Sequence, residues 1–236
     1  TKIDFWTKEE FEKVISLFYK EDYYQHFLFI SLWFLFMTGM RIGEATAIQW
    51  EDIVFDSGVL SIDKTLYYKN LDNYSFVEPK TKASVRQIAL DGDTLTLLRE
   101  WQNVQQAVIQ TNYVMSYNGV PTQKHTLANA ITRFSKKAGV HRIRLHALRH
   151  SHASLLISMG ENPLIIKDRL GHEDIETTLG TYGHLYPNSN FEVAHKLEGI
   201  MSYQTATQNE DTSPKNQFTA RYLRKGLETN NAITMQ

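Results

Sequence analysis

Residues 141–186 read HRIRLHALRHSHASLLISMGENPLIIKDRLGHEDIETTLGTYGHLY, and the rest of the chain is interpreted from this stretch. His146 and Arg149 are three positions apart, so a helix places them side by side on one face. Gly171 is expected to end a helix, because glycine readily adopts the left-handed conformation of a helix C-cap. His172 follows it directly, and Tyr182 lies at the far end of the next short helix. Basic side chains that face a tyrosine hydroxyl suggest chemistry on an anion.

The composition bounds the class of protein. The 236 residues, 42% of them hydrophobic, can bury one sizeable core or one domain with an appendage. No cysteine is present, which excludes disulfides and thiolate metal sites and is compatible with a reducing cytoplasm. The most apolar run, residues 27–37, is too short to span a bilayer, and the start does not resemble a signal peptide. We expect a cytoplasmic protein that does not contact a membrane.

The charge is distributed unevenly along the chain. The formal net charge is −1, yet no Asp or Glu occurs between Glu100 and Glu161. That window holds these basic residues: Lys124, Arg133, Lys136, Lys137, Arg142, Arg144 and Arg149. A window without acids predicts one positively charged face that binds an anionic polymer, and a merely solvated basic surface is the alternative. We predict that all of these residues except Arg149, together with Lys82, bind DNA.

Hydrophobic periodicity predicts an α+β fold, mostly helical with a small three-stranded antiparallel sheet. An almost wholly apolar helix is expected at 23–38 and must be central to the core. Before it, a capping box at 7–10 opens an amphipathic helix that reaches about residue 19. Further helices outside the quoted stretch are expected at 93–109, 122–138 and 190–203.

Residues 53–90 have the alternation and the turn residues of β-structure. The strands are expected at 59–62, 76–77 and 85–90, with a polar loop at 69–74. A turn at 80–84 closes the last hairpin and places Lys80 and Lys82 at its tip. Charged hairpin tips commonly serve only solubility.

The segment TGMRIGE, residues 38–44, follows the apolar helix. Arg41 and Glu44 are three positions apart, so the carboxylate can hold the guanidinium in place. The alternative is a surface ion pair of little energetic value, and taken alone the segment favours that alternative.

The quoted stretch also admits two other interpretations, a metal site and a helix-turn-helix. A metal site on His146, His150 and His152 is disfavoured, because zinc proteases need Glu where this chain has Ala147 and because an intervening arginine repels a dication. A helix-turn-helix over residues 162–182 would make the protein a DNA-binding regulator. That interpretation explains the basic face but leaves the arginines and Lys80 without a role.

The third interpretation is phosphoryl transfer to Tyr182. Attack on a DNA phosphodiester gathers a second negative charge on its non-bridging oxygens, and two planar guanidinium groups are suited to hold that charge. Arg41 and Arg149 would fill these roles. Histidines would donate hydrogen bonds, and one could accept the proton of the phenol. A lysine on a hairpin tip would protonate the departing 5′-oxygen, so that neither a metal nor another cofactor is required.

At these residues the chain resembles the catalytic domain of tyrosine recombinases, the phage- and transposon-type integrases. The resemblance is carried by TGMRIGE at 38–44, PKTKASVRQIAL at 79–90, LHALRHSHASLL at 145–156 and LGHEDIETTLGTYGHL at 170–185. These blocks occur in the family's order and spacing, and the matched region covers about residues 1–200. We therefore expect a catalytic domain over 1–203. The polar tail, 204–236, is expected to be flexible or to pack on a neighbouring subunit.

The resemblance implies a catalytic role for each matched residue. Arg41 looks like the first catalytic arginine, with Glu44 as its supporting acid. His146 and Arg149 match the family's His-x-x-Arg pair, and His172 matches its last histidine.

It also implies the nucleophile and the general acid. Tyr182 resembles the tyrosine that forms a 3′-phosphotyrosyl link, with nearby Tyr186 as the alternative. Lys80 looks like the hairpin lysine that acts as general acid, with Lys82 as the alternative. The remaining histidines of this region are left as supporting or structural residues: His150, His152 and His184.

Family members exchange two pairs of strands between two double-stranded DNA sites, through a Holliday junction inside a homotetramer. They also carry N-terminal DNA-binding domains, and the start of this chain at Thr1 suggests a fragment without them. Type IB topoisomerases share the same residue set but relax supercoils. The integrase-like blocks favour a recombinase that integrates or excises a mobile element. The resemblance also implies a bacterial, nucleoid-associated protein.

Overall fold

The computed structural model describes residues 3–70, 73–79, 81–186 and 190–201. The chain divides into two compact units, Thr1–Pro187 and Asn188–Gln236, and each is considered by itself. The predicted domain boundary at 203–204 lies outside the described residues and stays a prediction. Among the helices that the structure describes, none has the length and the apolar composition needed to cross a bilayer.

The predicted apolar helix is α2 (Tyr23–Thr38), and it forms the centre of the first unit. The Asp22 side chain caps its N-terminus by accepting a hydrogen bond from the backbone N–H of Gln25 at 2.7 Å. Most of its residues are buried, because three helices pack against it: α4 (Gly92–Val108), α5 (Lys124–Ala138) and α6 (Ala147–Ser158). The prediction of a central core helix is confirmed.

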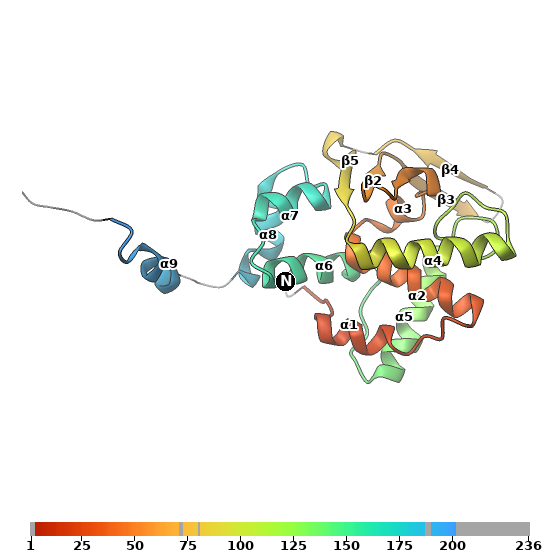
Figure 1. Ribbon diagram of the computed structural model, residues 1–236, viewed down its shortest axis with the longest axis horizontal. Helices are drawn as coiled ribbons and strands as arrows, with labels where there is room; N and C mark the ends of the chain where they lie inside the picture. The colour runs from red at the N-terminus through yellow and green to blue at the C-terminus, as the bar shows by residue number, and fades with distance from the viewer. Residues whose placement is uncertain (1–2, 71–72, 80, 187–189, 202–236) are drawn as a thin grey trace, which may run out of the picture. The chain divides into compact units, whose positions relative to one another are not determined.

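Shorter helices flank this centre (Figure 1). The predicted capping box opens α1 (Lys8–Ile15), with the hydroxyl of Thr7 and the carboxylate of Glu10 each accepting the other's backbone N–H. This helix ends earlier than predicted, at Ile15. After α2 come α3 (Ile42–Ala45) and the 3₁₀ turn η1 (Trp50–Asp52). In the second unit, α9 (Asn190–Leu197) begins where predicted and is shorter than predicted.

The β-region forms two separate sheets. The first is three-stranded and antiparallel, in the order β1 (Ile53–Val54), β2 (Val59–Ile62) and β5 (Arg86–Ala89). The second is a ladder of β3 (Thr65–Asn70) with β4 (Asn73–Val77). A small three-stranded antiparallel sheet was predicted and is present. The predicted partner of its last strand was wrong, because β5 pairs with β2 and the 76–77 strand pairs with β3.

The polar loop predicted at 69–74 is largely strand, because Tyr68 and Tyr74 face each other across the ladder. Their rings stack with centroids 5.5 Å apart, and such aromatic cross-strand pairs stabilise a ladder. The segment that precedes β5 is therefore a connection between two sheets and not a hairpin tip. It contains the 3₁₀ turn η2 (Lys82–Ser84), and Lys80 lies outside the described residues.

The quoted stretch folds into α6, α7 (Pro163–Leu170), α8 (Ile175–Tyr182) and the 3₁₀ turn η3 (Gly183–Leu185). Asn162 caps α7, and Pro163 occupies its first turn, where a missing N–H costs nothing. The core of this region is a separate, small cluster of buried residues: Ala153, Ile157, Ile166, Leu170 and Tyr182. Because α6 also packs on α2 and α7 packs on β5, this cluster adjoins the main core at the ends of α2 and α7.

Candidate active site

The ends of α2 and α7 hold Arg149. Its Nη1 donates to the carbonyl oxygen of Gly39 at 2.8 Å, and its Nη2 donates to that of Leu170 at 2.7 Å. The last carbonyls of a helix have no partner within the helix and carry partial negative charge, so a guanidinium satisfies and complements them. Arg149 is 3% exposed. It is therefore fixed by backbone atoms of two helices that are distant in sequence.

Arg41 also lies at the C-terminal end of α7. Its Nη2 donates to the carbonyl oxygen of Gly171, the C-cap of α7, at 3.3 Å, and its Nη1 donates to Glu44 Oε1 at 2.8 Å. The side chain of Arg41 is 40% exposed, whereas that of Glu44 is 2% exposed. The pair is thus not the surface ion pair that the segment favours when taken alone. One end of the guanidinium is anchored on a buried acid and the other faces the surroundings.

A third arginine, Arg86 on β5, completes this cluster and was not predicted. Its Nη2 donates to Glu44 Oε2 at 3.0 Å, and its other nitrogens donate to the carbonyl oxygens of Ser84 and Arg169 at 2.9 and 2.8 Å. Burial raises the pKa of the Glu44 carboxyl, but hydrogen bonds and charges from Arg86 and Arg41 outweigh it and hold that pKa below its ordinary value. Glu44 is therefore ionised and shared between two arginines.

Gly171 is required where the cluster meets α7. Its φ is +69°, a left-handed conformation that side chains rarely adopt. A Cβ atom there would lie 2.8 Å from Arg86 Nη1 and 2.9 Å from the carbonyl oxygen of Ala83. The predicted C-cap glycine thus also allows the β5 segment to approach the end of α7.

Tyr182 is the last residue of α8 and is 1% exposed. Its hydroxyl forms a hydrogen bond of 2.7 Å with Nδ1 of His150. The His172 ring lies parallel to the tyrosine ring, with centroids 6.5 Å apart, and its Nδ1 bonds to the Thr178 hydroxyl at 2.8 Å. His146, at the N-cap of α6, is exposed and meets His150 edge-on at 5.0 Å between centroids. Three histidines are therefore grouped at the tyrosine, and one of them, His150, is its hydrogen-bond partner.

The protonation states follow from burial and from the arginines. Burial raises the pKa of Tyr182 to about 12, although Arg149 and Arg41 act in the opposite direction. Burial and neighbouring positive charges lower the pKa of His150 and of His172 to about 4. Burial also lowers the pKa of Arg149 to about 10, so its guanidinium remains charged at neutral pH. At neutral pH the site combines cationic arginines, neutral imidazoles and a protonated phenol.

A cleft of about 360 Å³ opens on this cluster. It is lined by Arg41, Glu44, Thr65, Pro79, Thr81, Ser84, Gly171, His172, Glu173 and Thr177. Pro79 and Thr81, the sequence neighbours of Lys80, belong to this lining. Lys82 lines a different hollow, together with Asp63 and Glu78. Arg149 and Tyr182 are not part of the cleft wall.

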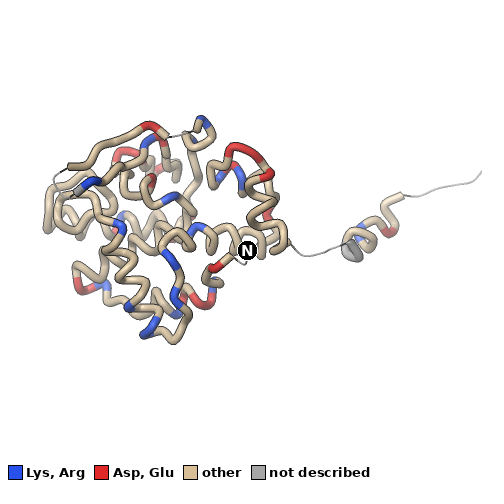
Figure 2. Tube along the Cα trace, turned by 180° about the vertical axis from the view of Figure 1, so that it is seen from behind, with Lys and Arg blue, Asp and Glu red and all other residues tan. Residues whose placement is uncertain are grey.

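The residues predicted to bind DNA are exposed, in contrast to Arg149: Lys82, Lys124, Arg133, Lys136, Lys137, Arg142 and Arg144. In Figure 2 the basic positions of α5 and of the segment that follows it are interrupted by no acid along the chain. Acids from α1 and its preceding segment come close in space, however. His141 lies 3.1 Å from Asp4 and 3.2 Å from Glu10. The window without acids is therefore partly neutralised by the fold.

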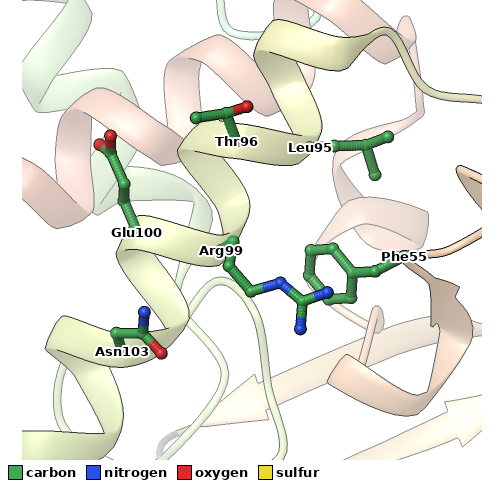
Figure 3. Close-up of a pocket in the computed structure, with 6 residues that line it drawn as sticks. All are labelled: Phe55, Leu95, Thr96, Arg99, Glu100 and Asn103. Atoms are coloured by element: carbon green, nitrogen blue, oxygen red, sulfur yellow. The ribbon is translucent and has the colours of Figure 1, made fainter.

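A separate hollow of about 360 Å³ lies between the β1–β2 connection and α4 (Figure 3). The Arg99 guanidinium stacks over the Phe55 ring at 3.9 Å from its centroid, and Leu95, Thr96, Glu100 and Asn103 line the remainder. None of the predicted site residues belongs to it. It is a surface depression in which an arginine stacks on an aromatic ring.

The alternative interpretations receive no support from this geometry. Within the part of the chain that the structure describes, no three His, Asp or Glu side chains are arranged to hold a metal ion. His152 is buried and accepts a hydrogen bond from Arg169 Nε at 3.1 Å, which is a structural role. Tyr182 is buried, so its hydroxyl must become exposed before it contacts a phosphate, whether in a helix-turn-helix or in catalysis.

Comparisons with known proteins agree with the sequence motifs. The fold is shared with the Tn1549 transposon integrase solved with transposon right end DNA, with a TM-score of 0.68, 20% identity, and 83% of this chain and 65% of that chain covered. It is also shared with the catalytic domain of bacteriophage HP1 integrase, with a TM-score of 0.52, 17% identity, and 84% and 97% covered. The fold is thus that of tyrosine recombinase catalytic domains.

The sequence defines the family directly. The profile of the phage integrase family matches residues 5–189, so the chain belongs to that family. Among curated proteins, the ICEBs1 integrase of Bacillus subtilis (strain 168) is 38% identical over 210 residues, which are 85% of this chain and 55% of that protein. The chain therefore spans about half the length of the curated relatives it matches.

Proposed function

We propose that this chain is the catalytic domain of a site-specific DNA recombinase that cuts and rejoins double-stranded DNA through Tyr182. One observation carries the proposal: Arg41 and Arg149 both donate to backbone carbonyls at the C-terminal end of α7, and His172, which follows directly, faces the ring of Tyr182. Membership of the phage integrase family supports it, as does the DNA in the complex of the structurally similar Tn1549 integrase.

In the proposed cleavage step, Arg41 and Arg149 hold the scissile phosphate through N–H donors that their carbonyl and carboxylate partners leave unused. A bond forms between the Tyr182 oxygen and phosphorus, and the bond from phosphorus to the 5′-oxygen breaks. Lys80 protonates the departing oxygen, for which the position of Pro79 and Thr81 in the Arg41 cleft is a support. His172 and His146 donate hydrogen bonds to the phosphate oxygens.

The product of that step is a 3′-phosphotyrosyl link. It conserves bond energy that hydrolysis would waste, so a 5′-hydroxyl from a second DNA strand can reverse the step without a nucleotide cofactor. Two such exchanges join two DNA sites through a Holliday junction. We propose that a homotetramer performs them in the cytoplasm, with residues 1–203 as the catalytic domain and the tail of 204–236 available to a neighbouring subunit. N-terminal DNA-binding domains in the whole protein stay a prediction.

The test uses a nicked suicide substrate, from which the small strand released by cleavage diffuses away and traps the adduct. A library of nicked duplexes with a randomised central sequence removes the need to know the recognition site. We expect a protein–DNA band on a denaturing gel that resists EDTA and is absent with Tyr182→Phe. Tyr186→Phe is the matched control and should retain the band. A band lost with Tyr186→Phe and kept with Tyr182→Phe would overturn the assignment.

Plasmid relaxation separates recombination from topoisomerase activity. A recombinase that requires two specific sites should not relax a supercoiled plasmid without them. Rapid relaxation of such a plasmid by the wild-type protein would indicate a type IB topoisomerase. No adduct from any member of the library, with protein that is folded and binds DNA, would reject both enzymes and leave a DNA-binding regulator.

A further inference from the structure

The hydroxyl of Tyr182 has one hydrogen-bond partner among the described residues, and that partner is none of the predicted catalytic residues. It is Nδ1 of His150, at 2.7 Å. His172 faces the tyrosine ring and bonds to Thr178, and His146 contacts the ring of His150. The two histidines predicted to be catalytic therefore do not bond to the attacking oxygen in this arrangement.

We propose that His150 accepts the proton of Tyr182 when the tyrosine attacks DNA. The inference rests on the proposed function, whose general base it identifies. As the bond between Tyr182 Oη and phosphorus forms, the phenolic proton passes to His150 Nδ1. The bond to the 5′-oxygen breaks at the same time, and that oxygen takes a proton from Lys80. One proton enters the histidine and one leaves the lysine, so the step balances.

The local chemistry allows the phenol to donate this hydrogen bond to His150. Because burial raises the pKa of Tyr182 to about 12, the phenol keeps its proton at neutral pH and can donate it. The groups that face His150 are His146 and Arg149 on its own segment, Tyr182 on α8, and His172 between α7 and α8. Burial, followed by the charges of His146 and Arg149, lowers the pKa of His150. The imidazole is therefore neutral, which is the form with a free lone pair on one nitrogen.

The same surroundings explain why the proton would move only with DNA bound. In the free protein, the field of Arg149 and the burial of the ring oppose an imidazolium. A phosphodiester on Arg41 and Arg149 places negative charge beside the ring and offsets that field. Substrate binding therefore makes His150 a stronger base at the moment when Tyr182 must lose its proton.

The experiment measures adduct formation in a single turnover with the suicide substrate, at saturating protein and over a range of pH. His150→Ala removes the base and should slow cleavage by about 10²–10⁴-fold. DNA affinity should remain within about threefold, because the hydrogen bond of His150 is to Tyr182 and not to an arginine of the phosphate clamp. Added imidazole should restore part of the activity of His150→Ala.

His150→Asn keeps a polar group near the position of Nδ1 but cannot take up a proton. With this variant the phenol must lose its proton to solvent hydroxide, so the cleavage rate should rise by about tenfold per pH unit across the neutral range. The wild-type rate should instead level off above the pKa of His150 in the complex. His184→Asn, an exposed histidine two residues beyond Tyr182, is the matched control and should behave as wild type.

The outcomes distinguish a general base from a residue that only holds the phenol in place. If His150→Asn cleaves at the wild-type rate with the wild-type pH profile, His150 only holds the phenol and the inference is overturned. The same follows if His150→Ala cleaves within about threefold of wild type while Tyr182→Phe is inactive. If the wild-type protein forms no adduct, the proposed function itself has failed, which is a distinct result.

Discussion

The arginines and the tyrosine of this site are held in opposite ways. Arg41, Arg86 and Arg149 each make at least two hydrogen bonds, to helix-end or loop carbonyls or to the buried Glu44. Among the described residues, the hydroxyl of Tyr182 makes a single hydrogen bond, to the His150 side chain. The part of the site that would hold charge is thus preformed, whereas the attacking hydroxyl is held by one hydrogen bond, along which the proposed proton transfer would run.

Packing follows the same division. The arginines contact the ends of helices that belong to, or adjoin, the main core around α2. Tyr182 belongs to the small cluster between α6, α7 and α8, beside which Leu164, Ile165 and Leu179 are exposed. Elements with few buried apolar contacts open at lower free-energy cost than a main core. The comparison teaches that the preorganised charges and the nucleophile lie in separate parts of the fold, of which the second opens at lower free-energy cost.

The largest effect on cleavage is expected when one of the preformed charges is removed. Arg149→Ala deletes a clamp on the transition state and leaves the buried carbonyls of Gly39 and Leu170 without a partner. Single-turnover cleavage should fall by about 10³-fold or more, and stability should also fall, by about 2–4 kcal/mol. Arg149→Lys should recover little, because a lysine lacks the planar fork that reaches two carbonyls. Gel assays of adduct formation and chemical denaturation measure the two effects.

His172 supplies the contrast on the side of the tyrosine. His172→Asn should slow cleavage by about tens- to hundredfold, because it removes a hydrogen bond rather than a fixed charge. A loss for Arg149→Ala that is milder than the loss for His172→Asn would contradict the division between the two halves.

The sequence was sufficient for features that depend on local chemistry. The apolar run specified α2, and the spacing of Arg41 and Glu44 predicted their pairing, because both partners lie within one turn. Arg86 was missed because two of its three acceptors are backbone carbonyls, which have no sequence signature. Its position in the 79–90 block, which also contains Lys80, was the only signal. The choice of His150 over its neighbours as the partner of Tyr182 depends on how α8 packs on α6, which the sequence does not encode locally.

The histidines beside the tyrosine and the carboxylate beside the arginines should affect stability in different pH ranges. His150 and His172 have a pKa of about 4 in the folded chain against about 6.5 when unfolded, so the unfolded state binds more protons between these values. Their burial therefore costs stability progressively as the pH falls from about 6.5 to about 4. The lowered pKa of Glu44 has its effect at lower pH. The ionised carboxylate contributes fully to stability above its unfolded pKa of about 4.3, and this contribution is lost as the pH falls through its folded pKa.

The measurement is the thermal midpoint of unfolding as a function of pH, without DNA. His172→Asn should flatten the curve between about pH 6.5 and 4, whereas Glu44→Gln should flatten it only below about pH 4.5. Glu44→Gln should also lower stability at neutral pH, by about 3 kcal/mol, because buried Arg86 and half-exposed Arg41 lose their charge partner. A wild-type midpoint that does not change between pH 7 and pH 5 would contradict the neutral, buried state of the histidines.

The smallest expected effects come from two glycines, one in each half. Gly171→Ala forces a side chain into a left-handed conformation and against Arg86 and the carbonyl of Ala83, so it should destabilise the fold by about 1–3 kcal/mol. Gly180 lies inside α8, exposed, with nothing within 4 Å of a Cβ atom. Gly180→Ala should therefore stabilise the protein, by about 0.5–1 kcal/mol, because alanine loses less backbone entropy in a helix.

These two variants also differ in their expected effect on cleavage. Gly171→Ala displaces the Arg86 and Glu44 frame, so it should slow cleavage even where the protein is fully folded. Gly180→Ala stiffens the helix that carries Tyr182 without touching the arginines. If the tyrosine must move to reach DNA, the stabilised variant should cleave more slowly than wild type, by a few-fold, as measured by single-turnover adduct formation. Faster cleavage by Gly180→Ala would instead mean that the folded position of Tyr182 is already the reactive one.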